Sequence, residues 1–271
     1  MIKQVQCLTI RKQRNSSMSI VISIPYIESI TDRFSDLSEI DFYQAVSIPV
    51  LQGGKEPRIV GNTVIDLATA TKLIERFGSR FKVLANSCFP QWNQEVSTLC
   101  EVLQANRGAI VVSRIDFARK IKNSFPDIVL YSSVIMNFYE SIHHILETGL
   151  FDVVGGSQFY NDDTDKMISE IPLQYRHKVM YLLLGCVWSR QCIRHYELPS
   201  LQWQYPTVIQ EIFQDSECTG RPGFNVEFEK LLDAGFKMFK FGYRTPTVEQ
   251  AEKTISTYLN RYYDWKMKHG I

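Results

Sequence analysis

The 271-residue chain lacks a long hydrophobic segment: no stretch approaches the roughly 18 consecutive apolar residues that a membrane-spanning helix needs. It also lacks an excess of charge of either sign. Its 30 basic and 29 acidic residues leave a formal net charge of +1, so charge does not indicate nucleic-acid binding. The first residues contain no apolar run of the kind found in secretory signals. We therefore expect a cytoplasmic protein without a membrane partner.

Two common hydrolase motifs are also missing. The chain contains neither the G-x-S-x-G motif of a serine nucleophile nor the H-E-x-x-H motif of zinc proteases. His144 and Glu147 have a spacing that can hold a metal on a helix, but their segment is predicted to lie on the outside of the fold. Six cysteines are present. In the cytoplasm they are more often reduced, metal-bound or catalytic than paired in disulfides.

Short apolar, β-branched runs alternate with amphipathic segments along most of the chain. Near-continuous apolar runs are typical of parallel strands that are covered on both faces. The predicted strands are 18–24, 41–47, 81–85, 108–112, 127–132, 151–155, 177–184 and 236–241.

Three helices are predicted from apolar residues at helical spacing and from capping residues. The first spans 62–77 and begins with Asn62 as its N-cap. The second spans 225–234 and stops at Gly235, which suits a left-handed residue after a helix. The last spans 248–267, where Thr247 and Gln250 have the spacing of a capping box.

Eight strands that alternate with helices predict a (β/α)8 TIM-type barrel, with a doubly wound open sheet as the alternative. We predict a single domain over 1–271, because this length is usual for one barrel. The only long interruption is an elaborated, cysteine-bearing loop at 186–223. In this fold such loops at the C-terminal face carry function.

The cysteines near strand ends are the best candidates for binding a cofactor. Cys186, Cys192 and Cys218 share the long loop, and Cys88 follows a strand that ends at the same face. Thiolates bind soft metals and iron–sulfur clusters, which usually take four of them. The alternative is that these are half-buried apolar cysteines of the core. We assign Cys100 to the core, because it lies within a helical stretch.

Polar residues also gather where the strands end. Lys240 and Arg244 lie at the end of the last strand, where barrels often bind phosphate and other anions, or they only solvate the strand end. Other polar residues at strand exits can line a pocket or cap helices. They are Asn86, Ser113, Ser132, Ser133, Asn137, Ser157 and Gln158.

Four segments, in the same order, resemble the collagenase-like peptidase family, the unassigned peptidase family U-thirty-two. The segment "FEKLLDAGFKMFKFGYR" is similar to the family's acidic helix, DAG-like turn and strand, although Tyr243 is inserted before the arginine. The segments "FKVLANSC" and "VSRIDFARKIKNSFPDIVLYSSVIMNF" resemble its strands with polar exits. "LLGCVWSRQCIRHY" resembles its cysteine segment, with Leu183 and Leu184 in place of Asn-Glu and Ile193 in place of a proline.

The resemblance implies a barrel whose cysteines bind a four-iron four-sulfur cluster. It places Cys186, Cys192, Arg194 and His195 at family positions. Some members of the family hydroxylate a ring or a nucleobase without oxygen, and others carry a protease label. The catalytic candidates are Asn86, Arg194, His195, Lys240 and Arg244.

Three functions remain open on the sequence alone. The first is an iron–sulfur enzyme that modifies a small molecule, a peptide or an RNA base, in some members by oxygen-independent hydroxylation. The second is a protease. The third is a non-catalytic subunit that binds a peptide or pairs with a second barrel as a homodimer or heterodimer. The replacement of Asn-Glu by Leu183 and Leu184 favours the third function slightly, because it removes a carboxylate.

Overall fold

A computed structural model of the chain describes residues 19–47, 66–85, 92–138, 140–156, 163–184, 227–241 and 248–271. Within these residues, eight parallel strands form one sheet in the order β5-β4-β3-β2-β1-β8-β7-β6. The strands are β1 (Val21–Pro25), β2 (Ile40–Ser47), β3 (Phe81–Ala85), β4 (Ala109–Val112), β5 (Val129–Ser132), β6 (Val154–Gly155), β7 (Val179–Leu184) and β8 (Met238–Phe241).

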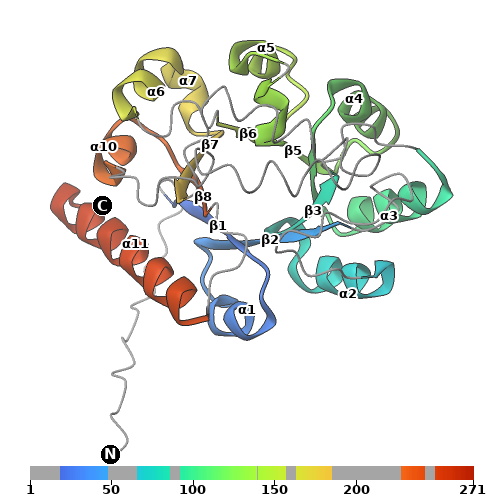
Figure 1. Cartoon of the computed structure of the whole chain (residues 1–271), viewed down its shortest axis with the longest axis horizontal. Helices are drawn as coiled ribbons and strands as arrows, with labels where there is room; N and C mark the ends of the chain where they lie inside the picture. Colours follow the sequence, from blue (N-terminus) through green and yellow to red (C-terminus); the bar gives the residue numbers. More distant parts are fainter. Residues whose placement is uncertain are drawn as a thin grey trace, which may run out of the picture.

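The sheet curls into a nearly closed barrel with helices around it (Figure 1). Its two edge strands meet through a single parallel bridge, between Tyr131 of β5 and Val153 just before β6. The predicted (β/α)8 barrel is therefore confirmed, and all eight predicted strands are present. The open-sheet alternative is excluded by this bridge, because a doubly wound sheet leaves its outer strands unpaired.

Helices follow the strands and form the outer ring (Figure 1). The α-helices are α1 (Glu28–Phe34), α2 (Leu67–Phe77), α3 (Gln94–Ala105), α4 (Ile115–Ser124), α5 (Ile142–Glu147), α6 (Thr164–Glu170), α7 (Leu173–Arg176), α10 (Phe228–Asp233) and α11 (Val248–His269). Two short 3-10 helices, η2 (Gly78–Arg80) and η3 (Val134–Phe138), stand before β3 and after β5.

Two predicted helix starts were wrong. The first helix begins at Leu67 rather than at 62, and its N-cap is Asp66, whose carboxylate accepts from the Thr69 N–H at 2.7 Å. The second begins at Phe228 instead of 225. Both predicted starts were placed at an asparagine that can cap a helix, Asn62 and Asn225, whereas a later residue stands at the N-cap of each helix in the structure.

The predicted helix ends agree better with the structure. Gly235 has a φ of +92° after α10, as expected for a left-handed residue. The N–H groups of Gly235 and Phe236 donate to the Leu232 and Leu231 carbonyls, which closes the helix end. The last helix, predicted to end at 267, continues to His269. The Thr247 cap lies outside the described residues.

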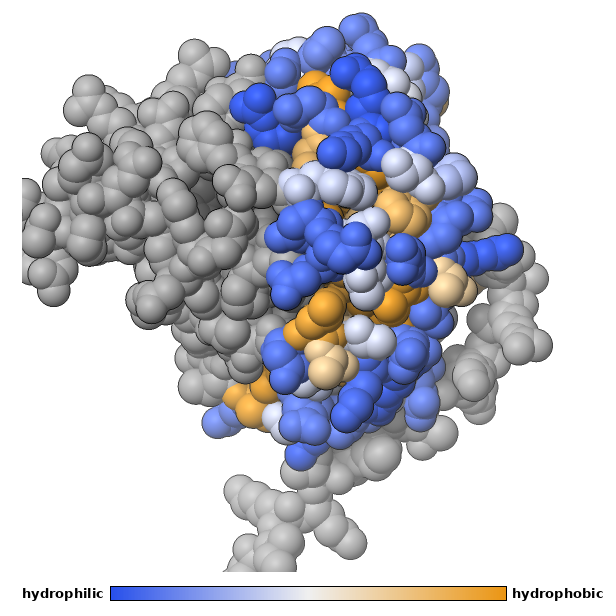
Figure 2. All heavy atoms as spheres, turned by 90° about the vertical axis from the view of Figure 1, so that its right-hand side faces the viewer, coloured by the Kyte–Doolittle hydropathy of each residue, from blue (hydrophilic) through white to orange (hydrophobic). Residues whose placement is uncertain are grey.

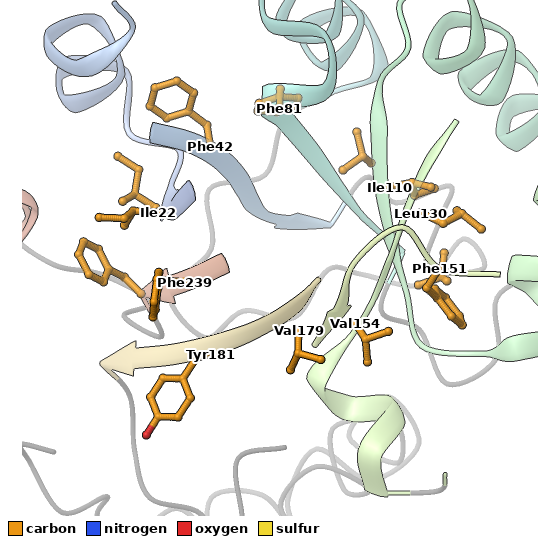
Figure 3. Packing of buried hydrophobic residues seen from close by; sticks show 14 of the residues in the cluster. Ile22, Phe42, Phe81, Ile110, Leu130, Phe151, Val154, Val179, Tyr181 and Phe239 are labelled. Atoms are coloured by element: carbon orange, nitrogen blue, oxygen red, sulfur yellow. The ribbon is translucent and has the colours of Figure 1, made fainter. Parts of the chain in front are cut away.

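The main core lies between the barrel and the helices. Side chains such as Ile22, Phe42, Phe81 and Phe239 point outward from the ring of strands into this layer (Figure 3). All four are fully buried. Because strand side chains alternate, their neighbours in sequence point into the barrel. A second, smaller hydrophobic cluster there is formed by Leu84, Ala109, Val111, Tyr131, Val153 and Met180.

The side of the molecule that Figure 2 shows is mostly polar. On the face that Figure 2 shows, hydrophilic residues predominate and hydrophobic ones form small separate groups. No helix among the described residues is long and apolar enough to cross a membrane.

Candidate functional site at the carboxyl-terminal mouth of the barrel

All eight strands run in the same direction, so their carboxyl ends meet at one rim of the barrel. Most of the predicted site residues follow these ends in segments outside the described residues. This applies to Asn86, Cys88, Ser157, Gln158, Cys186, Cys192, Arg194, His195, Cys218 and Arg244. The roles predicted for these residues remain predictions. Lys240, Ser113, Ser132, Ser133 and Asn137 are described and fix the geometry of the mouth.

Lys240 lies inside the upper part of the barrel, one residue before the end of β8. Its Nζ is 4.2 Å from the centre of the Tyr43 ring, a distance at which the ring face attracts a cation. The side chain is only partly buried. A partly exposed ammonium group near the end of a strand suits the predicted role of binding an anion.

Tyr43 holds this arrangement in place. Its hydroxyl donates to the Phe241 carbonyl at 2.5 Å, so a side chain of β2 reaches past β1 to the last residue of β8. Only 5% of the Tyr43 surface is exposed, and a ring locked at both ends has little rotamer freedom left. Tyr43 therefore fixes the aromatic face against which Lys240 rests. Tyr43 is not among the predicted site residues, because in the sequence it is one more apolar position of a strand.

The exit of β5 forms a second polar group on the same rim. The Ser132 hydroxyl accepts from the Gly155 N–H at 2.9 Å, and Asn137 Nδ2 donates to the Gly155 carbonyl at 2.7 Å. Both backbone polar groups of Gly155 are thus bound by side chains from β5 and η3. Ser113 and Ser133 are buried beside this group, each with 2% exposure. Ser132 and Asn137 therefore hold the backbone at Gly155 in place. The sequence predicted only pocket-lining or capping roles for these strand-exit residues.

Gly155 is required at this point. A Cβ there would lie 2.8 Å from the Ser132 carbonyl oxygen and 3.0 Å from the Val134 nitrogen, closer than real side chains come to backbone. The glycine lets the end of β5 approach β6 where few ladder bonds exist. At the lower end of the same seam, the Asp152 carboxylate accepts from the Leu130 N–H at 2.8 Å. Side chains thus add to the backbone bonds of this seam, such as the bond from the Ser132 N–H to the Val153 carbonyl at 2.9 Å.

A charged pair occupies the barrel interior below the mouth. Lys82 Nζ lies 2.7 Å from Asp41 Oδ2 and 2.9 Å from Ser23 Oγ, and only 1% of the lysine is exposed. The ammonium is also 5.0 Å from the centre of the Tyr131 ring. Burial lowers the pKa of Lys82, and Asp41 opposes this shift. Burial also raises the pKa of Tyr131 well above its usual range.

The two lysines belong to successive layers of the barrel. Lys82, Ser23 and Tyr131 come from the odd strands β3, β1 and β5, whereas Lys240 and Tyr43 come from the even strands β8 and β2. This matches the alternating layers of a TIM barrel. Asp41 and Lys82 stand second in their strands, near the amino-terminal end, where polar residues serve stability more than function.

Two further predictions about single residues can be checked. Cys100 is fully buried in the main core, as expected, and burial raises the pKa of its thiol to about 12. His144 lies on the outer helix α5, where its Nε2 is 3.7 Å from Glu140 Oε2. Within the described ranges, no group of three or more His, Cys, Asp or Glu residues has a metal-binding arrangement.

Comparisons with known proteins do not add to this picture. No family model, no curated protein and no solved structure matches the chain. The barrel and its mouth are therefore the basis on which function is inferred.

Proposed function

We propose that this chain is an iron–sulfur barrel enzyme of the kind found in the collagenase-like peptidase family, with its substrate bound at the carboxyl-terminal mouth. The observation that carries the proposal is the arrangement of strands β3 and β7. Four places separate them around the eight-stranded barrel, so they lie on opposite sides of its mouth. Cys88 is the third residue after β3, and Cys186 is the second after β7.

The chain lengths fit a shared site. A few extended residues reach roughly 7–10 Å, so thiols from opposite sides of a barrel can approach one another above its axis. Cys192 and Cys218 follow in the same loop as Cys186 and complete four thiolates, the usual ligand set of such a cluster. A bound cluster of this type supplies single electrons or Lewis acidity.

The described residues contribute binding and orientation. Lys240 offers a positive charge to an anionic group of the substrate, and Tyr43 keeps that charge against its ring. The interior below the mouth is filled by the layer of Lys82, Ser23 and Tyr131, which closes the barrel beneath a substrate. Arg194, His195, Arg244 and Asn86 are proposed to complete the polar surroundings of the substrate and the cluster.

The iron content of anaerobically purified protein tests this proposal. We expect a brown protein with about four irons per chain. Serine at Cys186, Cys192, Cys218 or Cys88 should remove most of the iron, whereas Cys100→Ser should keep it, because Cys100 is enclosed in the core. If only Cys88→Ser retains full iron, the cluster has three protein ligands. A wild-type protein without iron, or four serine variants that all keep it, contradicts the proposal.

A second candidate is a non-catalytic barrel that binds a peptide or pairs with another barrel. It is favoured by Leu183, which stands where the related family has asparagine. Leu183 is fully buried among the hydrophobic residues between barrel and helices, so it adds nothing polar to a site. An iron-free protein that forms a stable complex with a second barrel, measured by light scattering, would support this alternative. An iron-containing monomer excludes it.

A further inference from the structure

The side-chain amide of Asn137 has hydrogen-bond partners for its nitrogen but not for its oxygen. Its Nδ2 donates to the Gly155 carbonyl at 2.7 Å, and the Val134 carbonyl lies 3.5 Å from the same nitrogen. Because both neighbours are acceptors, the amide cannot be turned over without placing its oxygen against them. Asn137 Oδ1 is buried and has no hydrogen-bond partner within the part of the chain that is described.

An unpaired buried acceptor is rare in proteins and calls for an explanation. Only one other buried side-chain atom in the described ranges shares this state, the Thr31 hydroxyl oxygen. Thr31 lies on α1 in the outer helix ring. Asn137 instead lies in η3, the short helix that comes after β5 at the rim where barrel enzymes bind their substrates. Its position points to a ligand.

The Asn137 side chain is also held rigidly. The Gly155 peptide that anchors it is fixed from the other side by the Ser132 hydroxyl, and a Cβ at Gly155 would collide with the end of β5. The orientation of Oδ1 is therefore set before any ligand arrives. Preorganised acceptors of this kind discriminate strongly, because a ligand without a matching donor leaves the acceptor unpaired.

Lys240 stands on β8, which is separated from β6 by β7 alone. Gly155 of β6 pairs with Met180 of β7, which pairs with Met238 two residues before Lys240 on β8. Two strand spacings correspond to about 10 Å. This distance separates the backbones of β8 and β6, and the long Lys240 side chain extends from β8 into the barrel towards Tyr43. A small molecule above the barrel can therefore contact both Lys240 and the exit of β5 and β6.

We propose that Asn137 Oδ1 accepts a hydrogen bond from an O–H or N–H group of a small anionic ligand whose charge is bound by Lys240. This inference rests on the proposed function, because it places the substrate at the carboxyl-terminal mouth. It adds the chemical class of that substrate: an organic phosphate or carboxylate that carries a hydroxyl or amide donor a few atoms from its charge.

Two phosphates that differ only in their hydroxyl groups test the proposal by calorimetry. Glycerol 3-phosphate offers an anion with O–H donors, and n-propyl phosphate offers the same anion without them. We expect the wild-type protein to bind glycerol 3-phosphate at least about fivefold more tightly, the difference that one hydrogen bond makes. In Asn137→Leu this preference should disappear, because leucine has a similar size and no acceptor.

Ser132→Ala is the matched control. It removes the other side-chain bond to Gly155 and loosens the same peptide, but it leaves Oδ1 in place. The preference for glycerol 3-phosphate should therefore survive in this variant. The proposal is overturned if the wild type binds neither phosphate or both equally, or if Asn137→Leu keeps the preference. A crystallographic water that stays on Oδ1 with glycerol 3-phosphate bound also overturns it.

The outcome is separable from that of the proposed function. Lys240→Met should weaken binding of both phosphates by the same factor, which tests the anion site alone. The iron content tests the cluster alone, because neither phosphate needs it in order to bind. A protein without iron that still discriminates through Asn137 would refute the iron–sulfur proposal and support this one.

Discussion

The barrel interior contains two lysines in successive layers with opposite environments. Lys82 is 1% exposed and lies within 2.7 Å of the Asp41 carboxylate, with the Ser23 hydroxyl as a further partner. Lys240 is partly exposed and rests on the face of the Tyr43 ring near the rim. Lys82 is enclosed together with a carboxylate and a hydroxyl group, whereas Lys240 lies at the mouth of the barrel.

The difference shows how one fold separates stability from function. A buried charge must be paired, because its desolvation costs several kcal/mol. Asp41 and Lys82 stand near the amino-terminal ends of their strands, where polar residues serve stability more than function. Lys240 is only partly buried near the rim, and we propose an anionic ligand as its partner there. Substitutions at the two lysines should therefore affect different properties.

Removal of the Asp41 carboxylate should have the largest effect on stability. Asp41→Ala leaves the Lys82 ammonium buried without its counter-ion, so we expect the free energy of unfolding to fall by about 3–5 kcal/mol. Urea denaturation followed by circular dichroism measures this change. Lys240→Ala is the matched control and should cost no more than about 1 kcal/mol. Similar losses in the two variants would show that the layers do not differ as described.

For ligand binding, in contrast to stability, we expect the substitution of Lys240 to have the large effect. Lys240→Met should weaken the binding of inorganic phosphate or an organic phosphate by about 1.5–3 kcal/mol, the range for a hydrogen bond to a charged group. Arg244→Ala should have an effect of the same size if Arg244 shares the anion site. Calorimetry gives the affinities, and both variants should unfold at the same urea concentration as the wild type. Unchanged phosphate affinity in Lys240→Met would remove Lys240 from the site.

Replacement of the whole buried group should cost little. The triple variant Ser23→Ala, Asp41→Leu, Lys82→Met exchanges the polar cluster for apolar side chains of similar volume. Because such exchanges are often neutral or stabilising, its stability should lie within about 1 kcal/mol of the wild type, far above that of Asp41→Ala. A triple variant as unstable as Asp41→Ala would show that the charges themselves are needed for the barrel to form.

The sequence predicts the barrel well for a physical reason. Strands buried on both faces are apolar almost throughout, so each of the eight runs stands out from its amphipathic neighbours. Helix starts are less well defined, because Asn62 and Asp66 are both good capping residues and only the backbone decides between them. The sequence also contains the signal for Lys82, a charged residue inside the run "FKVLA".

What the sequence cannot give is the pairing across strands. Lys82, Asp41 and Ser23 come from three different strands, and their contact depends on the register of β1, β2 and β3. The same is true of Tyr43, which reaches β8 from β2. Asn137 was recognised as a polar residue at a strand exit, but its unpaired oxygen depends on where the Gly155 carbonyl lies. Local patterns reveal residue types at strand ends, and only the closed barrel shows which of them meet.

The smallest effect that we predict concerns alkaline pH. Burial lowers the pKa of Lys82 below its ordinary value of 10.5, so between its folded pKa and 10.5 the unfolded chain binds more protons at this residue than the folded chain does. The contribution of Lys82 to the free energy of unfolding must then rise as the pH rises from its folded pKa to 10.5. This contribution is least favourable at pH values below the folded pKa. Urea unfolding of the wild type and Lys82→Met from pH ~7 to ~10 measures this, because the other titrating groups are common to both proteins. The wild type should gain stability relative to the variant as the pH rises. Parallel profiles would mean that the ammonium is not destabilised inside the barrel, and a relative loss would mean that Asp41 outweighs burial and holds the pKa of Lys82 above its ordinary value.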